Sequence, residues 1–126
     1  MDIIYYDDNI IVAIKPAGVI STDEPGGMPS LLRAMLGDDA APIYTVHRLD
    51  AAVGGVMVWA RTPKAAAELS RQVQEKALKK AYFAVCSGIP TPDAGEMRDL
   101  LFKDSVKQKS FAVISPRRGV KEALLD

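Results

Sequence analysis

Short runs of β-branched and aromatic residues, each closed by turn-forming residues, constrain the fold of this chain more than any other feature. Residues 3–6 and 10–14 are two such runs, and the intervening Asp7-Asp8-Asn9 has turn chemistry, so they predict a hairpin. Similar runs recur along the whole sequence. The predicted strands cover residues 3–6, 10–14, 43–46, 53–61, 79–86, 96–102, 110–114 and 121–125.

Two segments have helical rather than strand periodicity. Thr62 followed by Pro63 has the form of a helix N-terminus, and the Ala-, Glu- and Gln-rich stretch after it predicts a helix over residues 63–77. A shorter helix is predicted at residues 30–36, where Gly37 stops it. Because strands outnumber helices in a mixed order, we expect the α+β class, with a mixed, largely antiparallel sheet and flanking helices.

Length and composition restrict the organisation and location of the chain. Its 126 residues, 48% hydrophobic and 25% charged, are typical of one globular domain spanning residues 1–126. One cysteine, Cys86, and one histidine exclude an internal disulfide and argue against a metal site. The sequence has no signal-peptide pattern, and its longest apolar run, residues 53–60, is too short for a membrane helix. We therefore expect a cytoplasmic protein with no membrane partner.

The charges of the chain give one argument against nucleic-acid binding and one that is compatible with it. Sixteen basic and sixteen acidic residues sum to zero, so the chain lacks the global basicity of many nucleic-acid-binding proteins. This argues against RNA or DNA as a partner. Residues 1–50 hold three basic and eight acidic residues, whereas residues 51–126 hold thirteen basic and eight acidic ones. Residues 51–126 are therefore compatible with a basic face that binds nucleic acid.

The main chemical candidate is the tetrapeptide His47-Arg48-Leu49-Asp50, which lies between two predicted strands and before Gly54-Gly55. Those glycines indicate a bulge or a close approach of two backbones. An aspartate kept ionised by a neighbouring arginine is a poor general base, but it can act as a nucleophile or stabilise a developing cation, which suits a glycosidic carbon. The alternative is an Arg48–Asp50 ion pair that only shapes the loop.

Three ordered segments make a family resemblance specific. The segments YDDNIIVAIKPAGVIS, VHRLDAAVGGVMVWART and KKAYFAVCSGIP resemble, in this order, the RluA-type pseudouridine synthases. This family converts uridine in ribosomal or transfer RNA to pseudouridine. The resemblance implies an isomerase that acts on RNA without a metal or an organic cofactor.

Three residues take catalytic or base-displacing roles from this resemblance. The family's catalytic aspartate falls on Asp50, which either attacks the sugar carbon or removes a sugar proton while the N1 glycosidic bond breaks. The family's active-site tyrosine falls on Tyr82, although its position in an alternating segment equally fits a core residue. Arg48 matches the arginine that helps to displace the target nucleotide from its stack.

Four further residues are expected to meet RNA or to support the site. Lys15 belongs to the KPAG segment near the family's active site, though a lysine before a turn is also typical of a solvated strand end. His47 is expected to support the tetrapeptide through hydrogen bonds. Lys79 and Lys80 are candidates for phosphate contacts.

Two departures from the family pattern matter. Val53-Gly54-Gly55 stands where many members have Thr-Ser-Gly, so a hydroxyl pair near Asp50 is absent. The family's domain also continues through a strand carrying a basic residue that pairs with the aspartate. We therefore expect this chain to be the N-terminal part of the catalytic domain, truncated at its C-terminus. An open sheet edge would then favour self-association.

Three functions are compatible with these observations. The first is an RNA pseudouridine synthase that uses Asp50. The second is a catalytically incompetent RNA-binding module of the same fold. The third, a glycosidase or nucleosidase, ranks last because it needs a second carboxylate near Asp50 to activate water.

Overall fold

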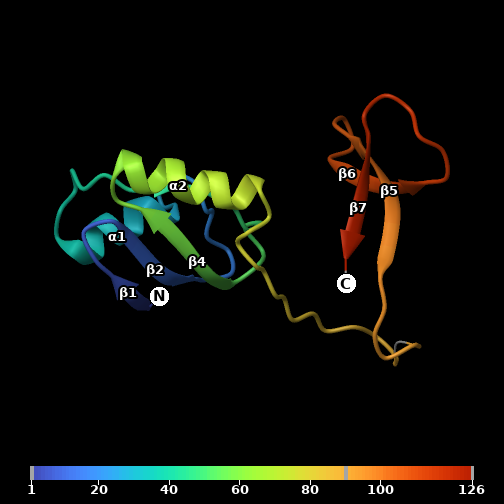
Figure 1. Ribbon diagram of the computed structural model, residues 1–126, viewed down its shortest axis with the longest axis horizontal. Coiled ribbons are helices and arrows are strands. Elements are labelled where there is room, and N and C mark those ends of the chain that lie inside the picture. Colours follow the sequence, from blue (N-terminus) through green and yellow to red (C-terminus); the bar gives the residue numbers. More distant parts are fainter. Residues whose placement is uncertain (1, 90, 126) are drawn as a thin grey trace. The chain divides into compact units, whose positions relative to one another are not determined.

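The structure, a computed structural model, describes residues 2–89 and 91–125 of the chain. These residues form two compact units, Met1–Ala81 and Tyr82–Asp126 (Figure 1). Each unit has its own antiparallel sheet, and two helices accompany the first. The expected α+β class with antiparallel pairing is therefore confirmed, whereas the single domain over residues 1–126 stays a prediction.

The first unit contains a four-stranded sheet in the order β1-β2-β4-β3. The predicted hairpin forms from β1 (Ile3–Tyr6) and β2 (Ile10–Lys15), and β2 pairs along its length with β4 (Gly55–Ala60). The short β3 (Tyr44–Thr45) closes the other edge. Asp7 fixes the hairpin turn because its Oδ1 accepts hydrogen bonds from the amides of Asn9 and Ile10, at 2.7 and 2.8 Å.

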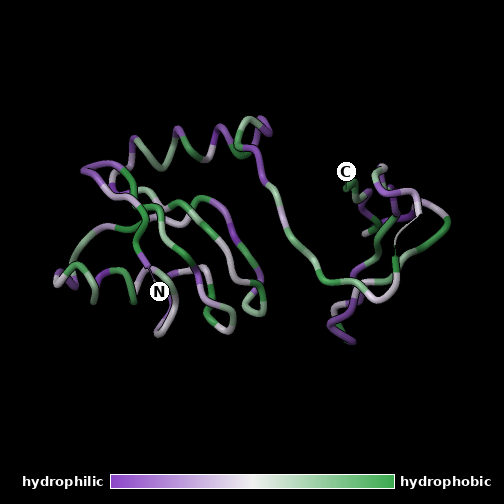
Figure 2. Tube along the Cα trace, turned by 90° about the horizontal axis from the view of Figure 1, so that it is seen from below, coloured by the Kyte–Doolittle hydropathy of each residue, from purple (hydrophilic) through white to green (hydrophobic). Residues whose placement is uncertain are grey.

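Both predicted helices form, with small shifts at their ends. The first, α1 (Met28–Leu36), begins two residues before the predicted start and ends at Gly37, whose φ of 68° lies in the left-handed region. The second, α2 (Pro63–Gln74), begins as predicted, because the Thr62 side chain accepts a hydrogen bond from the Ala65 amide at 3.1 Å. It ends three residues before the predicted end. The helices lie on opposite sides of the sheet (Figure 2).

The core of the first unit lies between its sheet and α1. Alternate residues of β2 and β4 face it, and the registers Ile11↔Trp59 and Ala13↔Met57 place their side chains side by side. Met28 and Leu32 of α1 and Ile43 complete the cluster. The predicted close approach at Gly54 is confirmed, because a Cβ there would lie 3.3 Å from the Lys15 carbonyl oxygen. This approach brings the end of β2 against the start of β4.

The second unit is a three-stranded sheet in the order β6-β5-β7. Its strands are β5 (Met97–Asp104), β6 (Lys109–Val113) and β7 (Val120–Leu125), all close to the predicted ranges. Both partners run antiparallel to β5. None of its described residues is buried, so this sheet has no core of its own.

One predicted strand is wrong. Residues 79–86 alternate as a strand should, but the described part of the chain contains no strand that pairs with them. Phe83 and Val85 are almost completely exposed, at 106% and 104%. An alternating pattern becomes a strand only when a neighbouring strand takes up its backbone hydrogen bonds, and here none does.

Candidate functional site

The tetrapeptide His47-Arg48-Leu49-Asp50, hereafter the HRLD loop, connects β3 to β4 in the first unit. Its alternate residues have contrasting environments. His47 and Leu49 are partly buried, whereas Arg48 and Asp50 are exposed. Three groups outside the loop, on Ser21, Lys15 and Val58, hold the buried side of this segment.

Ser21 holds the middle of the loop. Its hydroxyl donates a hydrogen bond to the Leu49 carbonyl at 2.7 Å and accepts one from the Leu49 amide at 3.0 Å. Ser21 is only 3% exposed, so these bonds form away from competing water. Both backbone polar groups of the residue before Asp50 are therefore satisfied by one side chain.

Lys15 holds the segment that follows the loop. Its side chain is completely buried, and its ammonium donates to the carbonyls of Pro16 at 3.0 Å, of Ala51 at 3.1 Å and of Val19. Burial lowers the pKa of this ammonium, and the nearby charge of Asp50 raises it in part. The Gly18 amide also donates to the Ala51 carbonyl, at 2.7 Å, so the residue after Asp50 is tied to the end of β2.

His47 holds the start of the loop through β4. Its Nε2 accepts a hydrogen bond from the Val58 amide at 3.2 Å, which requires this nitrogen to be unprotonated. Burial lowers the pKa of His47, and the positive charge of Lys80 lowers it further. The loop is therefore held by a neutral imidazole.

The side chains of Arg48 and Asp50 are left free by this arrangement. Neither forms an ion pair within the described part of the chain, so the expected alternative of a structural Arg48–Asp50 pair is not what shapes the loop. An exposed carboxylate and an exposed guanidinium, two residues apart on a restrained loop, can meet a ligand without first breaking a contact with each other. The arrangement can bind an anion and act on an electrophilic carbon.

The other predicted residues lie on the segment after α2. Lys79 and Lys80 are exposed in the first unit, and the positive charge of Lys80 contributes to the lowered pKa of His47. Tyr82 is 58% exposed and belongs to the second unit. His47, Arg48, Asp50, Lys15 and Lys80 thus all belong to the first unit, whereas Tyr82 belongs to the second.

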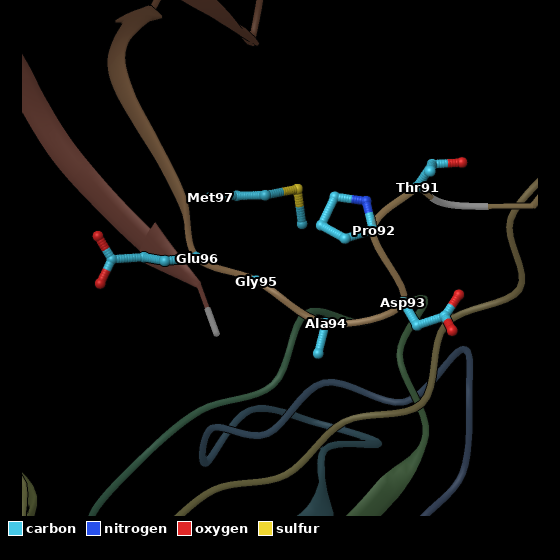
Figure 3. A pocket seen from close by; sticks show the side chains of 7 residues that line it. All are labelled: Thr91, Pro92, Asp93, Ala94, Gly95, Glu96 and Met97. Atoms are coloured by element: carbon cyan, nitrogen blue, oxygen red, sulfur yellow. The ribbon is translucent and has the colours of Figure 1, made fainter.

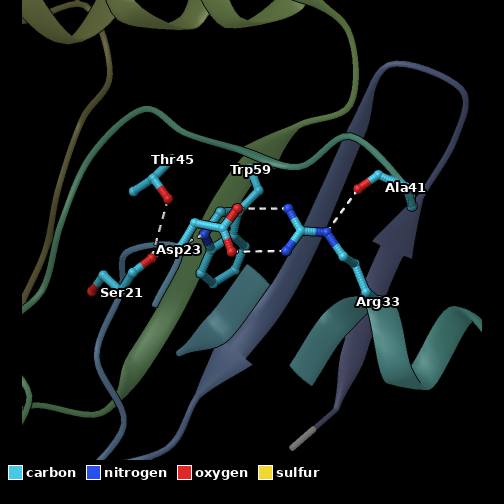
Figure 4. A network of polar contacts seen from close by, with 6 residues as sticks. All are labelled: Ser21, Asp23, Arg33, Ala41, Thr45 and Trp59. Atoms are coloured by element: carbon cyan, nitrogen blue, oxygen red, sulfur yellow. Dashed lines mark hydrogen bonds and ion pairs between the residues drawn. The ribbon is translucent and has the colours of Figure 1, made fainter. Parts of the chain in front are cut away.

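A second network restrains the segment that contains Ser21 (Figure 4). The Arg33 guanidinium makes two hydrogen bonds to the Asp23 carboxylate, at 2.7 and 2.6 Å, and its Nε donates to the Ala41 carbonyl at 2.9 Å. The Ser21 carbonyl accepts from the Thr45 hydroxyl at 3.2 Å and from the Trp59 indole at 3.4 Å. These contacts fix the Ser21 carbonyl and the chain two residues after it.

Sequence reasoning missed Ser21. A serine in a polar Gly- and Pro-rich loop has no signal in periodicity or composition, and its partner Leu49 is 28 residues away. The available signal was indirect. The loop that contains Ser21 follows the KPAG segment, which the resemblance already placed near the active site.

A pocket in the second unit contains none of the residues that the sequence predicted for the active site. Thr91 to Met97 line a pocket in the second unit, and the carboxylates of Asp93 and Glu96 point away from each other there (Figure 3). Within residues 2–89 and 91–125, no group of three His, Cys, Asp or Glu side chains is placed to hold a metal ion. Of the helices described, none reaches the length and hydropathy of a membrane span.

The fold matches that of a solved enzyme domain. Human RNA pseudouridylate synthase domain containing 4 superposes with a TM-score of 0.76 at 24% identity, over 97% of this chain and 51% of that chain. In sequence, residues 9–125 match the RNA pseudouridylate synthase family. The chain therefore belongs to this family.

Two curated relatives agree with this assignment. Ribosomal large subunit pseudouridine synthase D of Neisseria meningitidis serogroup B is 35% identical over an alignment of 120 residues that covers 90% of this chain and 32% of the relative. The dual-specificity RNA pseudouridine synthase RluA of Escherichia coli K12 is 40% identical over 96 residues, 74% of this chain and 43% of the relative. The chain thus spans less than half the length of these relatives.

Proposed function

We propose that this chain is the N-terminal part of the catalytic domain of an RNA pseudouridine synthase, with Asp50 as its essential carboxylate. The substrate is a uridine in ribosomal or transfer RNA. Membership of the family supports the reaction. One relative is named for the ribosomal large subunit and another for dual specificity on RNA, which supports the class of substrate.

The exposed Asp50 carboxylate on a restrained loop is the observation that carries this proposal. Its neighbours Leu49 and Ala51 are held at their backbones by Ser21, Lys15 and Gly18, so the carboxylate is presented without being used in the fold. Holding a reactive group in place lowers the entropic part of a barrier. A loop aspartate with a purely structural role would normally accept hydrogen bonds itself, as Asp7 does in the hairpin turn.

In the proposed reaction the N1–C1′ bond of uridine breaks, the uracil turns, and C5 bonds to C1′. The C5 proton passes to solvent and N1 gains a proton, so the product is an isomer of the substrate. Asp50 acts at the sugar while the glycosidic bond is broken. Arg48 occupies the space vacated by the displaced nucleotide, and Tyr82 stacks on the uracil ring.

The lysines take two different roles in this proposal. Lys79 and Lys80 are exposed and contact phosphates. Lys15 is buried and donates to three carbonyls, which supports a role in holding the loop rather than in touching RNA. His47, which accepts the Val58 amide, likewise positions the loop.

The test is release of tritium from RNA labelled at uridine C5. The chain should release label to water, and Asp50→Asn should lower the release at least a thousandfold, because the reacting carboxylate is lost. Asp39→Asn is the matched control, since Asp39 is an exposed aspartate in a different loop. Release by Asp50→Asn at the rate of the unmodified chain would refute the role of Asp50.

Two other outcomes would identify the alternatives. Salt-sensitive RNA binding without release of label would identify a non-catalytic RNA-binding module. Free uracil among the products would identify a nucleosidase.

A further inference from the structure

Ser21 makes an unusual double contact with the backbone of the HRLD loop. The same Oγ is the donor to the Leu49 carbonyl, at 2.7 Å, and the acceptor from the Leu49 amide, at 3.0 Å. Among neutral side chains of this length a hydroxyl does both most strongly, because it carries one donor and two acceptor lone pairs, whereas a thiol is a weak donor and a weak acceptor. The contact therefore depends on chemistry as well as on size.

We propose that Ser21 is a positioning residue that sets the orientation of Asp50 for catalysis. This inference rests on the proposed role of Asp50. The Leu49 carbonyl and the Asp50 amide belong to the same planar peptide unit. Fixing the carbonyl therefore fixes the orientation of the peptide plane to which the Asp50 Cα is attached. Ser21 does not touch the reacting atoms and acts only through this peptide.

The support behind Ser21 is rigid enough for this role. Its carbonyl accepts hydrogen bonds from Thr45 and Trp59, and Trp59 is completely buried in the core. Two residues further on, Asp23 is held by two hydrogen bonds from Arg33 (Figure 4). These hydrogen bonds thus connect the core of the first unit to the exposed loop that carries the Asp50 carboxylate.

Among the described residues, Ser21 alone contributes a side chain to the hydrogen bonds of Leu49. Loss of the hydroxyl leaves a partly buried amide and carbonyl to find water, which loosens the peptide unit. A reactive group displaced by about 1 Å can lose two orders of magnitude in rate.

A pair of isosteric variants tests the proposal. Ser21→Thr keeps the hydroxyl and Ser21→Val replaces it by a methyl group, so the two share any crowding, including that near the Met57 sulfur at 3.6 Å. We expect kcat for tritium release to be at least tenfold lower for Ser21→Val than for Ser21→Thr, with KM for RNA equal within about twofold. Thr22→Val is the matched control, because the Thr22 hydroxyl donates a hydrogen bond to the exposed Glu24 carboxylate and, among the described residues, none to the HRLD loop.

Hydrogen exchange of the backbone amides provides a second measurement that does not need turnover. The Leu49 amide should exchange at least tenfold faster in Ser21→Val than in Ser21→Thr, while core amides of β2 and β4 keep their protection. A purely structural role would raise exchange across the core as well, and would lower kcat only through the folded fraction.

The outcomes separate this inference from the proposed function. Equal kcat for Ser21→Val and Ser21→Thr, with Asp50→Asn inactive, would overturn the role of Ser21 alone. Release by Asp50→Asn at the unmodified rate would overturn the proposed function and this inference with it. If the unmodified chain releases no label, the exchange of the Leu49 amide becomes the deciding measurement. Equal exchange in the two variants would overturn the proposed contact between Ser21 and Leu49. Faster exchange in Ser21→Val would support that contact.

Discussion

The two compact units of this chain use the same strand-forming residues but bury very different amounts of side chain. Every fully buried side chain that the structure describes lies in Met1–Ala81, where a sheet is covered by helices. The described residues of the other unit form a single layer of three strands in which Phe102, Leu100 and Leu101 are only partly buried. Alternating sequence thus makes a strand in both units, but only a second layer makes a core.

The candidate site lies in the unit that has the core. The HRLD loop belongs to the unit with the core, and its contacts through Ser21 and Lys15 depend on buried positions. A precisely oriented carboxylate needs such a support. Three matched pairs of substitutions and one pH dependence test how far the contrast extends.

The largest effect is expected for Trp59→Ala. Trp59 is completely buried in the centre of the first unit, so its loss should lower the free energy of unfolding by about 3–5 kcal/mol. Phe102→Ala, in the second unit, should cost about 1–2 kcal/mol, since Phe102 is partly buried and contacts Arg117, whose guanidinium lies 4.8 Å from the ring centroid. Urea unfolding followed by circular dichroism measures both. Equal losses would show that the second unit is as well packed as the first.

Lys15→Met should have the next largest effect. It removes three hydrogen bonds from a buried ammonium and leaves the carbonyls of Pro16, Val19 and Ala51 without this donor, at a cost of about 2–4 kcal/mol. Lys103→Met, on an exposed strand position of the second unit, should change stability by less than about 0.5 kcal/mol. The fluorescence of the single tryptophan during urea unfolding reports on the first unit. An unchanged midpoint for Lys15→Met would contradict the holding role of this lysine.

Local sequence chemistry predicted much of this fold. Thr62 and Pro63 marked the start of α2, Gly37 marked the end of α1, and the Asp7 turn marked the first hairpin. Each of these signals acts within a few residues, so it can be read without knowing the rest of the structure. The strand predicted at residues 79–86 failed because a strand also needs a partner, and a partner is not a local property.

The sequence drew attention to the exposed residues of the candidate site, whose roles stay a prediction, and not to the residues that support them. Arg48 and Asp50 lie within one tetrapeptide, and the family resemblance assigned them roles. Ser21 and Lys15 act on that loop from 28 and 36 residues away in sequence. Lys15 was expected to meet RNA or to be a solvated strand end, because lysine is rarely buried. Its burial follows from the carbonyls that converge on it, which only the fold brings together.

Arg33→Leu tests a smaller contrast between ion pairs. Arg33 makes two hydrogen bonds to Asp23 with its side chain 20% exposed, whereas Arg98 forms ion pairs with Glu96 at 3.3 Å and Glu122 at 3.1 Å with its side chain 63% exposed. We expect a loss of about 1 kcal/mol for Arg33→Leu and less than about 0.5 kcal/mol for Arg98→Leu, because solvent-exposed ion pairs are weak. Urea midpoints at low and high salt measure both effects. A larger loss for Arg98→Leu would reverse the contrast between the units.

The smallest effect is a pH dependence confined to the first unit, which holds the only histidine of the chain. Burial, and secondly the charge of Lys80, lower the pKa of His47 from its usual value of 6.5. Between 6.5 and the lowered value the unfolded chain binds a proton that the folded chain does not, so stability falls as the pH drops through this window and is fully present above it. Protonation also removes the acceptor for the Val58 amide.

The expected result is a lower urea midpoint at pH 5 than at pH 7.5, measured by tryptophan fluorescence and smaller than the change caused by Lys15→Met. His47→Gln should remove most of this difference, because its side chain does not titrate and its amide oxygen can still accept a hydrogen bond. Hydrogen exchange of the β5 and β6 amides, corrected for the intrinsic effect of pH, should show no matching change in the second unit. A pH dependence that persists in His47→Gln would assign the effect to carboxylates and leave the imidazole without a role in stability.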